Sequence, residues 1–191
     1  MGIGVGYSSR LYTGFNGGRL SGIAGESNTT SEFEGAPLLE LDLRIMSKNS
    51  PYGFQTGVVI DFEHKNRSTT INGISNSTSV FERSKLSTYT LEGSLAGRFE
   101  RFFVMAGINY SVISFSPSRN FSGSTSMQGG NNTHIGLGYY INDNFAIELM
   151  LWRRKRLKFS TTASNGTADS YGTGEAAATN LTLKYFPTFK Y

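Results

Sequence analysis

The sequence predicts an all-β fold, an eight-stranded antiparallel up-and-down transmembrane β-barrel. Three observations predict it: a two-residue alternation in eight segments, connections that alternate between short and long, and aromatic residues at the ends of the apolar faces. Only 17% of residues are charged, 13% are aromatic and 23 are Gly, a balance that favours strands and turns. The longest apolar stretch, Phe145 to Trp152, contains Glu148 and is far shorter than the ~18 residues of a spanning helix.

The alternation sets apolar residues on one face and small or polar residues on the other. In the first segment, Ile3, Val5, Tyr7, Leu11 and Phe15 share one face, opposite Gly4, Gly6, Ser8, Arg10 and Tyr12. In the second, Leu39, Leu41, Leu43 and Ile45 alternate with Glu40, Asp42 and Arg44. The remaining six segments lie at about 54–63, 89–99, 102–112, 134–141, 145–152 and 180–185.

The connections between these segments differ in length in a regular way. Residues 47–51, 100–101 and 142–144 have the composition of tight turns. The other four connections, about 16–36, 65–86, 116–131 and 160–176, are long and rich in Ser, Thr, Asn and Gly. Outer-membrane barrels have short periplasmic turns and long extracellular loops. Residues 1–191 are therefore expected to form one barrel domain in the bacterial outer membrane, with periplasmic termini and four extracellular loops.

The polar face of a small barrel points into a narrow lumen, where a charge without a partner costs several kcal/mol. Acids and bases on this face are nearly balanced, so we expect a paired network that largely closes the lumen. Its predicted members are Arg10, Glu40, Asp42, Arg44, Asp61, Glu63, Glu92, Arg98, Glu148, Arg154 and Lys184.

Aromatic residues on the apolar face distinguish a membrane barrel from a soluble one, because membrane barrels carry aromatic girdles at both interfaces. The predicted periplasmic girdle comprises Tyr52, Phe54, Phe99, Phe102, Tyr139, Phe145 and Tyr185. The predicted outer girdle comprises Phe15, Phe62, Tyr89, Tyr110 and Phe159.

A basic run, Arg153-Arg154-Lys155-Arg156-Leu157-Lys158, lies at the outer end of the seventh segment. Guanidinium groups bind phosphate in a bidentate manner, and lipopolysaccharide phosphates lie at this level. The predicted lipopolysaccharide-contacting rim comprises Lys65, Arg67, Arg83, Lys85, Arg119, Arg153, Lys155, Arg156 and Lys158. The net charge of +4 alone is weak evidence for nucleic-acid binding, and no such partner is predicted.

Two stretches resemble a known group of proteins. Residues 136–149, GLGYYINDNFAIEL, resemble the hairpin of small OmpA-, OmpX- and OmpW-like outer-membrane barrels. Leu181, Leu183, Tyr185, Phe189 and Tyr191 resemble the terminal-strand signal for barrel assembly, although Pro187 departs from it and should end the last strand early. The resemblance implies outer-membrane location, but such barrels include adhesins, resistance factors, small channels and lipid-modifying enzymes.

Three functions follow as hypotheses. The first is a non-enzymatic, monomeric barrel that presents its loops to a protein or glycan, or supports envelope integrity. The second is a narrow channel, or a lateral route, for small or apolar solutes. The third is lipid A modification, which would need a hydroxyl such as that of Ser84 or Ser87 bonded to His64 on the lipid-facing side. We predict no catalytic, cofactor-binding or metal-binding residues, since the chain has no Cys and only two His.

Overall fold

The computed structural model describes residues 1–9, 11–19, 26–46, 51–72, 74–75, 83–117, 123–163 and 168–187. Its strands are β1 (Gly2–Ser8), β2 (Leu11–Arg19), β3 (Glu26–Phe33), β4 (Ala36–Met46), β5 (Tyr52–Ile71), β6 (Ile74–Ser75), β7 (Lys85–Phe99), β8 (Phe102–Ser116), β9 (Gly123–Gln128), β10 (Asn131–Tyr140), β11 (Phe145–Ala163) and β12 (Ala168–Tyr185). In this part of the chain, no helix has the length and hydrophobicity needed to span a membrane.

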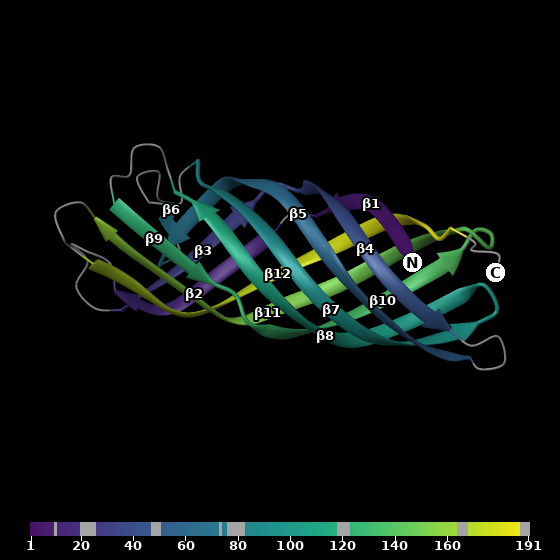
Figure 1. Ribbon diagram of the computed structural model, residues 1–191. Helices are drawn as coiled ribbons and strands as arrows, with labels where there is room; N and C mark the ends of the chain where they lie inside the picture. Colours follow the sequence, from purple (N-terminus) through teal and green to yellow (C-terminus); the bar gives the residue numbers. More distant parts are fainter. Residues whose placement is uncertain are drawn as a thin grey trace.

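These strands form a closed antiparallel ring of eight, as the sequence predicts. Three of the eight are interrupted and consist of β1 with β2, β3 with β4, and β9 with β10. The ring closes because β12 pairs with β11 on one side and with both β1 and β2 on the other. Figure 1 shows both chain ends at the short-turn end of the barrel, and β12 ends before Pro187 as expected.

The outer surface of the barrel carries a band of exposed apolar side chains, which we call the apolar belt. On β8 it runs from Phe102 to Val112 through alternate residues. With a rise of about 3.4 Å per residue and a tilt of about 40°, this stretch gives a belt about 26 Å tall, the height of the apolar band of a membrane barrel. The predicted periplasmic girdle is confirmed, because all seven of its aromatic residues are exposed on the outer face.

The pattern of polarity inverts at the upper edge of the belt, which is the edge nearer the long hairpins. Within the belt, the outward side chains are apolar, whereas the inward ones are mostly polar, apart from a cluster of Ala96, Phe103, Met105, Ala146 and Met150. Above it, Ser114 and Lys158 point outward, whereas Ile113, Leu157 and Phe159 are buried inside. The strands therefore continue beyond the membrane as a water-exposed barrel with its own apolar core.

Irregular pairing at this edge changes the face on which later residues lie. The break between β1 and β2 turns Leu11 inward and Tyr12 outward, the reverse of the prediction from strict alternation. A bulge between Asp61 and His64 likewise turns Glu63 outward and His64 inward. Each interruption adds residues without a ladder partner, so the two-residue period restarts in a new phase.

The outer girdle is confirmed in part. Phe62, Tyr89 and Tyr110 are exposed on the belt, but Phe159 is buried inside the barrel, beyond a bulge between Arg154 and Leu157. The side chain of Phe15 lies outside the described residues.

Much of the sequence that we assigned to long loops forms strands. β2 and β3 occupy most of 16–36, β5 continues to Ile71, and β11 and β12 pair as far as Thr162 with Ala168. The Ser, Thr, Asn and Gly residues of these segments lie on hairpins above the belt. There, water can form hydrogen bonds with the polar side chains on the outer face. The hairpin tips at 20–25, 76–82, 118–122 and 164–167 lie outside the described residues.

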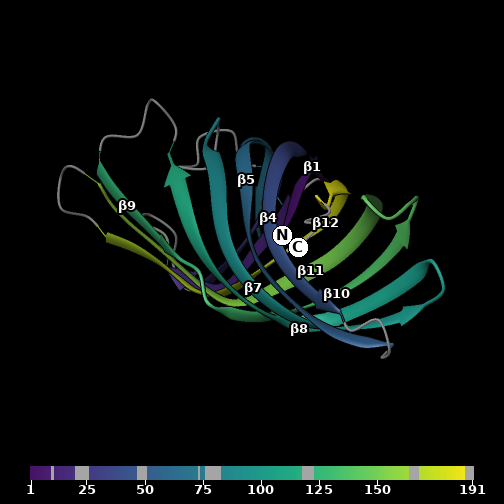
Figure 2. The same ribbon diagram turned by 45° about the vertical axis from the view of Figure 1, so that its right-hand side comes forward.

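One seam of the ring is not closed along its whole length. β8 pairs with β10 from Phe102 up to Tyr110, opposite Asn131, and Ser111 N donates to Gly130 O at 3.4 Å. Above this point no ladder pairing joins the described residues of β8 and β9, although β9 pairs with β11 along its other edge. Figure 2 shows the two strands diverging upward. We call this gap in the pairing the β8–β9 seam.

The inversion of polarity predicts the level at which the hydrocarbon of the membrane ends, and two substitutions test this level. Val5 is exposed midway up the belt, whereas Ser114 is exposed above it. We expect Val5→Arg to lower the free energy of unfolding by about 2–4 kcal/mol, because its charge would enter the hydrocarbon. Ser114→Arg should change it by roughly 0.5 kcal/mol or less. Urea unfolding in lipid vesicles, followed by fluorescence of the single Trp, measures both; equal effects would contradict this position of the membrane.

Candidate functional site

The lower half of the lumen is filled by one ammonium group and the carboxylates around it. Lys184 on β12 is fully buried, and its Nζ donates to Glu40, to Asp42 at 2.8 Å and to Glu148 at 2.8 Å. These acids come from β4 and β11, so one side chain joins three barrel strands across the lumen. All three protons of the ammonium group are used.

Arg44 completes this assembly on the side of the short turns. Its guanidinium donates to Glu148 Oε2 at 2.8 Å, to Gln55 Oε1 at 2.7 Å and to the hydroxyl of Tyr140 at 2.9 Å. It also lies over the ring of Phe103, 4.3 Å from the centroid. We call Glu40, Asp42, Arg44, Glu148 and Lys184 the charged plug. Its ion pairs cross the lower lumen from β4 to β11 and β12.

A polar layer that the sequence did not reveal lies above the plug. Ser94 Oγ is 2.6 Å from His134 Nε2, and Asn109 Nδ2 is 3.2 Å from His134 Nδ1. The three residues come from β7, β8 and β10, and all are buried. A hydroxyl beside an imidazole suggests a nucleophile, but the cavity next to this layer is only about 10 Å³, enough for one water at most. We therefore interpret the group as a structural hydrogen-bond chain.

The structure brings part of the predicted lumen network together. Glu40, Asp42, Arg44, Glu148 and Lys184 form the plug, and Glu92 and Asp61 are buried in the lumen, Asp61 accepting from Thr88 at 2.5 Å. Glu63 was predicted wrongly, since it points outward and pairs with Lys85 at 2.8 Å. Arg98 lies at the short-turn mouth, over the ring of Tyr140. The side chains of Arg10 and Arg154 lie outside the described residues.

The expected balance of charge is not found among the described lumen residues. Five acids, Glu40, Asp42, Asp61, Glu92 and Glu148, share the interior with two bases, Arg44 and Lys184. Neutral donors also bind these carboxylates: the hydroxyl of Thr88, for example, donates a hydrogen bond to Asp61. Glu63 and Arg98, which the prediction placed in the lumen, point outward and lie at the mouth, respectively, and because the side chains of Arg10 and Arg154 lie outside the described residues the balance of the whole network stays a prediction.

An apolar cluster occupies the lumen above the polar layer, at and beyond the upper edge of the belt. We call it the inner apolar cluster: Leu11, Phe33, Leu86, Ile113, Met127, Trp152, Leu157, Phe159, Ala176 and Ala178, with Phe115 packed against it. Phe115 contacts Phe159 edge to face, with ring centroids 5.1 Å apart. Phe115 on β8 and Met127 on β9 flank the β8–β9 seam. The cluster therefore borders the incomplete part of the wall.

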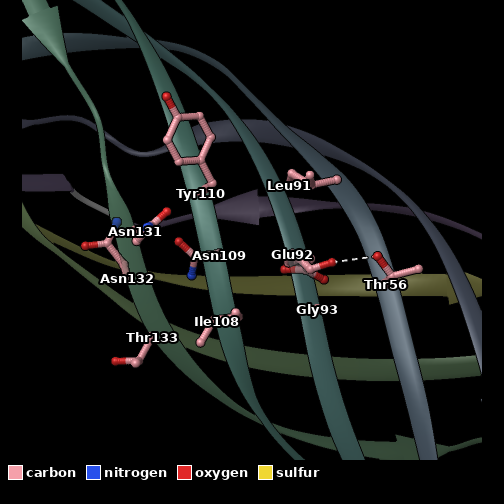
Figure 3. A pocket seen from close by; sticks show the side chains of 10 residues that line it. All are labelled: Thr56, Leu91, Glu92, Gly93, Ile108, Asn109, Tyr110, Asn131, Asn132 and Thr133. Atoms are coloured by element: carbon pink, nitrogen blue, oxygen red, sulfur yellow. Dashed lines mark hydrogen bonds between the residues drawn. The ribbon is translucent and has the colours of Figure 1, made fainter.

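The outer wall is hollowed below this seam. Figure 3 shows the depression, of about 590 Å³, across β5, β7, β8 and β10. Outward-facing Leu91, Ile108 and Tyr110 line it together with Thr56, whose hydroxyl donates to Glu92 O at 2.8 Å. Gly93 opens the space, since a Cβ there would approach only Phe54, at 3.7 Å. Its upper margin is formed by Tyr110 and Asn131, the last pair before the seam begins.

The predicted basic rim lies at and above the upper edge of the belt. Lys65, Arg67, Arg83, Arg153 and Lys158 are exposed, and Lys85 is half-exposed. Acids share this surface: Arg67 lies 3.7 Å from Glu32, and Arg153 Nε donates to Glu175 at 2.9 Å. Arg119 and the side chains of Lys155 and Arg156 lie outside the described residues. Contact with lipopolysaccharide stays a prediction.

The arrangement expected for lipid A modification is not supported at His64. This residue is fully buried inside the barrel rather than lipid-facing, and its Nδ1 lies 2.8 Å from Glu34 O. Ser84 is buried as well, whereas Ser87 is half-buried. Among the described residues, no group of three or more acids and histidines has the arrangement of a metal site.

No protein-family model matches the sequence, and no curated protein matches it. Solved structures share the fold. The outer membrane protein OprG from Pseudomonas aeruginosa is 14% identical with a TM-score of 0.60, over 98% of this chain and 97% of that one. The outer membrane protein AlkL, determined in lipid bilayers, is 15% identical with a TM-score of 0.56, over 100% of this chain and 92% of that one. The fold is therefore that of an outer-membrane barrel, and the apolar belt agrees with that location.

The plug predicts a large stability difference between two lysines. Lys184→Met should lower the free energy of unfolding by about 3–5 kcal/mol, because it leaves three buried carboxylates without their common cation. Lys158→Met, on the water-exposed outer face of β11, should change it by roughly 0.5 kcal/mol or less. Urea unfolding in lipid vesicles measures both. A Lys184→Met protein as stable as the parent would show that the plug does not hold the barrel together.

Proposed function

We propose that the barrel is a lateral route for small apolar molecules, which enter from the long-hairpin end and leave sideways through the β8–β9 seam into the membrane. The observation that carries this proposal is the seam itself, which borders the inner apolar cluster on one side and the belt on the other. The seam begins just above the pair Tyr110 and Asn131. A solute that passes between β8 and β9 there reaches the outer surface beside the exposed side chains of Tyr110 and Val112, at the upper edge of the belt.

Three features along the route support this function. Phe115 and Met127 give the seam apolar margins that a small hydrophobic solute can displace. The depression lined by Leu91, Ile108 and Tyr110 begins at the lower end of the seam, so a solute that leaves the seam can bind to its apolar side chains on the lipid side. The charged plug prevents passage straight down the lumen, because an apolar solute would have to break its ion pairs without replacing them.

The same plug argues against a conducting pore. Bulk ions would also have to displace Lys184 and Arg44 from their acids. Presentation of the hairpin tips to a protein or glycan, our first hypothesis from the sequence, concerns segments outside the described residues and stays a prediction.

The proposal is tested by bridging the seam. The chain has no Cys, so Phe115→Cys with Met127→Cys introduces the only two thiols, one on each side of the seam. A bifunctional thiol reagent should lower uptake of an apolar fluorescent probe by cells carrying this variant by about tenfold, relative to the same variant before bridging. The rate of fluorescence increase as the probe reaches lipid measures the effect.

Bridging elsewhere on β8 provides the control. Ser87 and Ser114 are direct partners on β7 and β8, where the wall is already closed. A bridge between Ser87→Cys and Ser114→Cys should leave uptake unchanged. Uptake that is insensitive to the seam bridge would refute the lateral route.

A further inference from the structure

The short-turn mouth of the barrel contains a second cavity, which plays no part in the proposed lateral route. It has a volume of about 340 Å³ and lies below the plug, lined by Arg44, Arg98, Arg101, Tyr140, Asp143 and Phe186 among others. Three guanidinium groups and one carboxylate converge there. We call it the arginine pocket, and we propose that it binds a phosphate group.

Arg98 is held in position but is not neutralised. Its Nε donates to Glu100 O at 2.8 Å, and its guanidinium lies 5.1 Å from the centroid of Tyr140. Its backbone N donates to Pro51 O at 2.6 Å, which fixes the end of β7 against the neighbouring turn. In the described part of the chain, no acid pairs with Arg98 or Arg101, so both positive charges are available to an anion.

Arg44 forms the inner wall of the pocket and differs from the other two. Its charge is compensated by Glu148, and it is packed against the rings of Phe103 and Phe186, with centroids 4.3 and 4.8 Å away. It therefore contributes shape and rigidity, while Arg98 and Arg101 contribute the charge that would bind the ligand.

The opposite wall is fixed by the turn between β10 and β11. Asn142 Oδ1 accepts from the backbone N of Asn144 and Phe145, both at 2.9 Å. Asn144 Nδ2 donates to Phe186 O at 2.8 Å, and Phe186 N donates back to Asn144 O at 2.7 Å. These bonds tie the turn to the end of β12. The pocket is thus formed before a ligand arrives, which lowers the entropic cost of binding.

The chemistry favours a phosphate group over other small anions. Guanidinium forks match pairs of phosphate oxygens, and a phosphate group has enough oxygens to meet two forks and the side-chain NH2 group of Asn142 together. Asp143 limits affinity by repulsion, since it is the acid that lines this pocket. The phosphate group can belong to a phospholipid headgroup of the adjacent leaflet or to a soluble phosphate compound in the periplasm.

The test uses the whole barrel, purified in a non-ionic detergent free of phospholipid, at an ionic strength of about 0.15 M to suppress non-specific attraction. Inorganic phosphate and monomeric short-chain phosphatidylglycerol are titrated separately by calorimetry. Arg98→Ala with Arg101→Ala should weaken binding by about tenfold or more. Asp143→Asn should tighten it severalfold, a gain that a misfolded protein could not show.

Arg153→Ala distinguishes the pocket from the predicted basic rim, the other place where arginines could bind phosphate, because Arg153 lies in that rim at the opposite edge of the belt and pairs with Glu175. It should leave the affinity unchanged. Binding of both probes assigns the pocket to a headgroup, and binding of inorganic phosphate alone assigns it to a soluble compound. Binding of neither probe, or equal binding by the parent and the double-arginine variant, would overturn the proposal.

Discussion

Pairing of the backbone is the constraint on which the rest of this structure depends. Within lipid, each N–H and C=O group without a partner costs several kcal/mol, so strands in a membrane must close into a ring. Here the ring is continuous from Phe102 up to Tyr110 on β8, which is most of the belt. The seam begins at Ser111, next to Val112 at the upper edge of the belt, where headgroups and water can satisfy the free edges. An opening in the wall is therefore possible only at this level.

Closure of the ring also determines what fills it. A ring of eight strands encloses a space that side chains just fill, so the inward face becomes a core whatever its polarity. In the belt that core is largely polar, with a small apolar cluster around Phe103 and Met105, and Lys184 stabilises it by holding three acids at once. Above the belt the outside faces water, and the core becomes apolar around Phe33, Leu157 and Phe159. The breaks and bulges at the rim, such as the one between Asp61 and His64, allow single strands to serve both environments.

The sequence was sufficient for the barrel, its eight strands and its periplasmic girdle, because alternation and turn composition are local properties of the chain. It also placed Glu40, Asp42, Arg44, Glu148 and Lys184 in the lumen. It failed at Leu11, Glu63, His64 and Phe159, since one extra residue in a strand reverses the face of all that follow, and nothing in the local composition marks that residue. The contact between Ser94 and His134 and the seam depend on the register between distant strands, which one sequence does not reveal.

The plug and the seam are complementary parts of one arrangement. Without the plug, a barrel with this seam would also let polar solutes pass to the periplasm. Without the seam, a plugged barrel would let nothing pass. In the proposed lateral route, Lys184 and Arg44 close the way down, while the inner apolar cluster lies beside the seam and the depression at Gly93 lies below it on the outer wall. Glu148 links the two cations of the plug, because it binds Lys184 with one oxygen and Arg44 with the other. The position of Arg44 in the wall of the arginine pocket is thus set by the same carboxylate that seals the lumen.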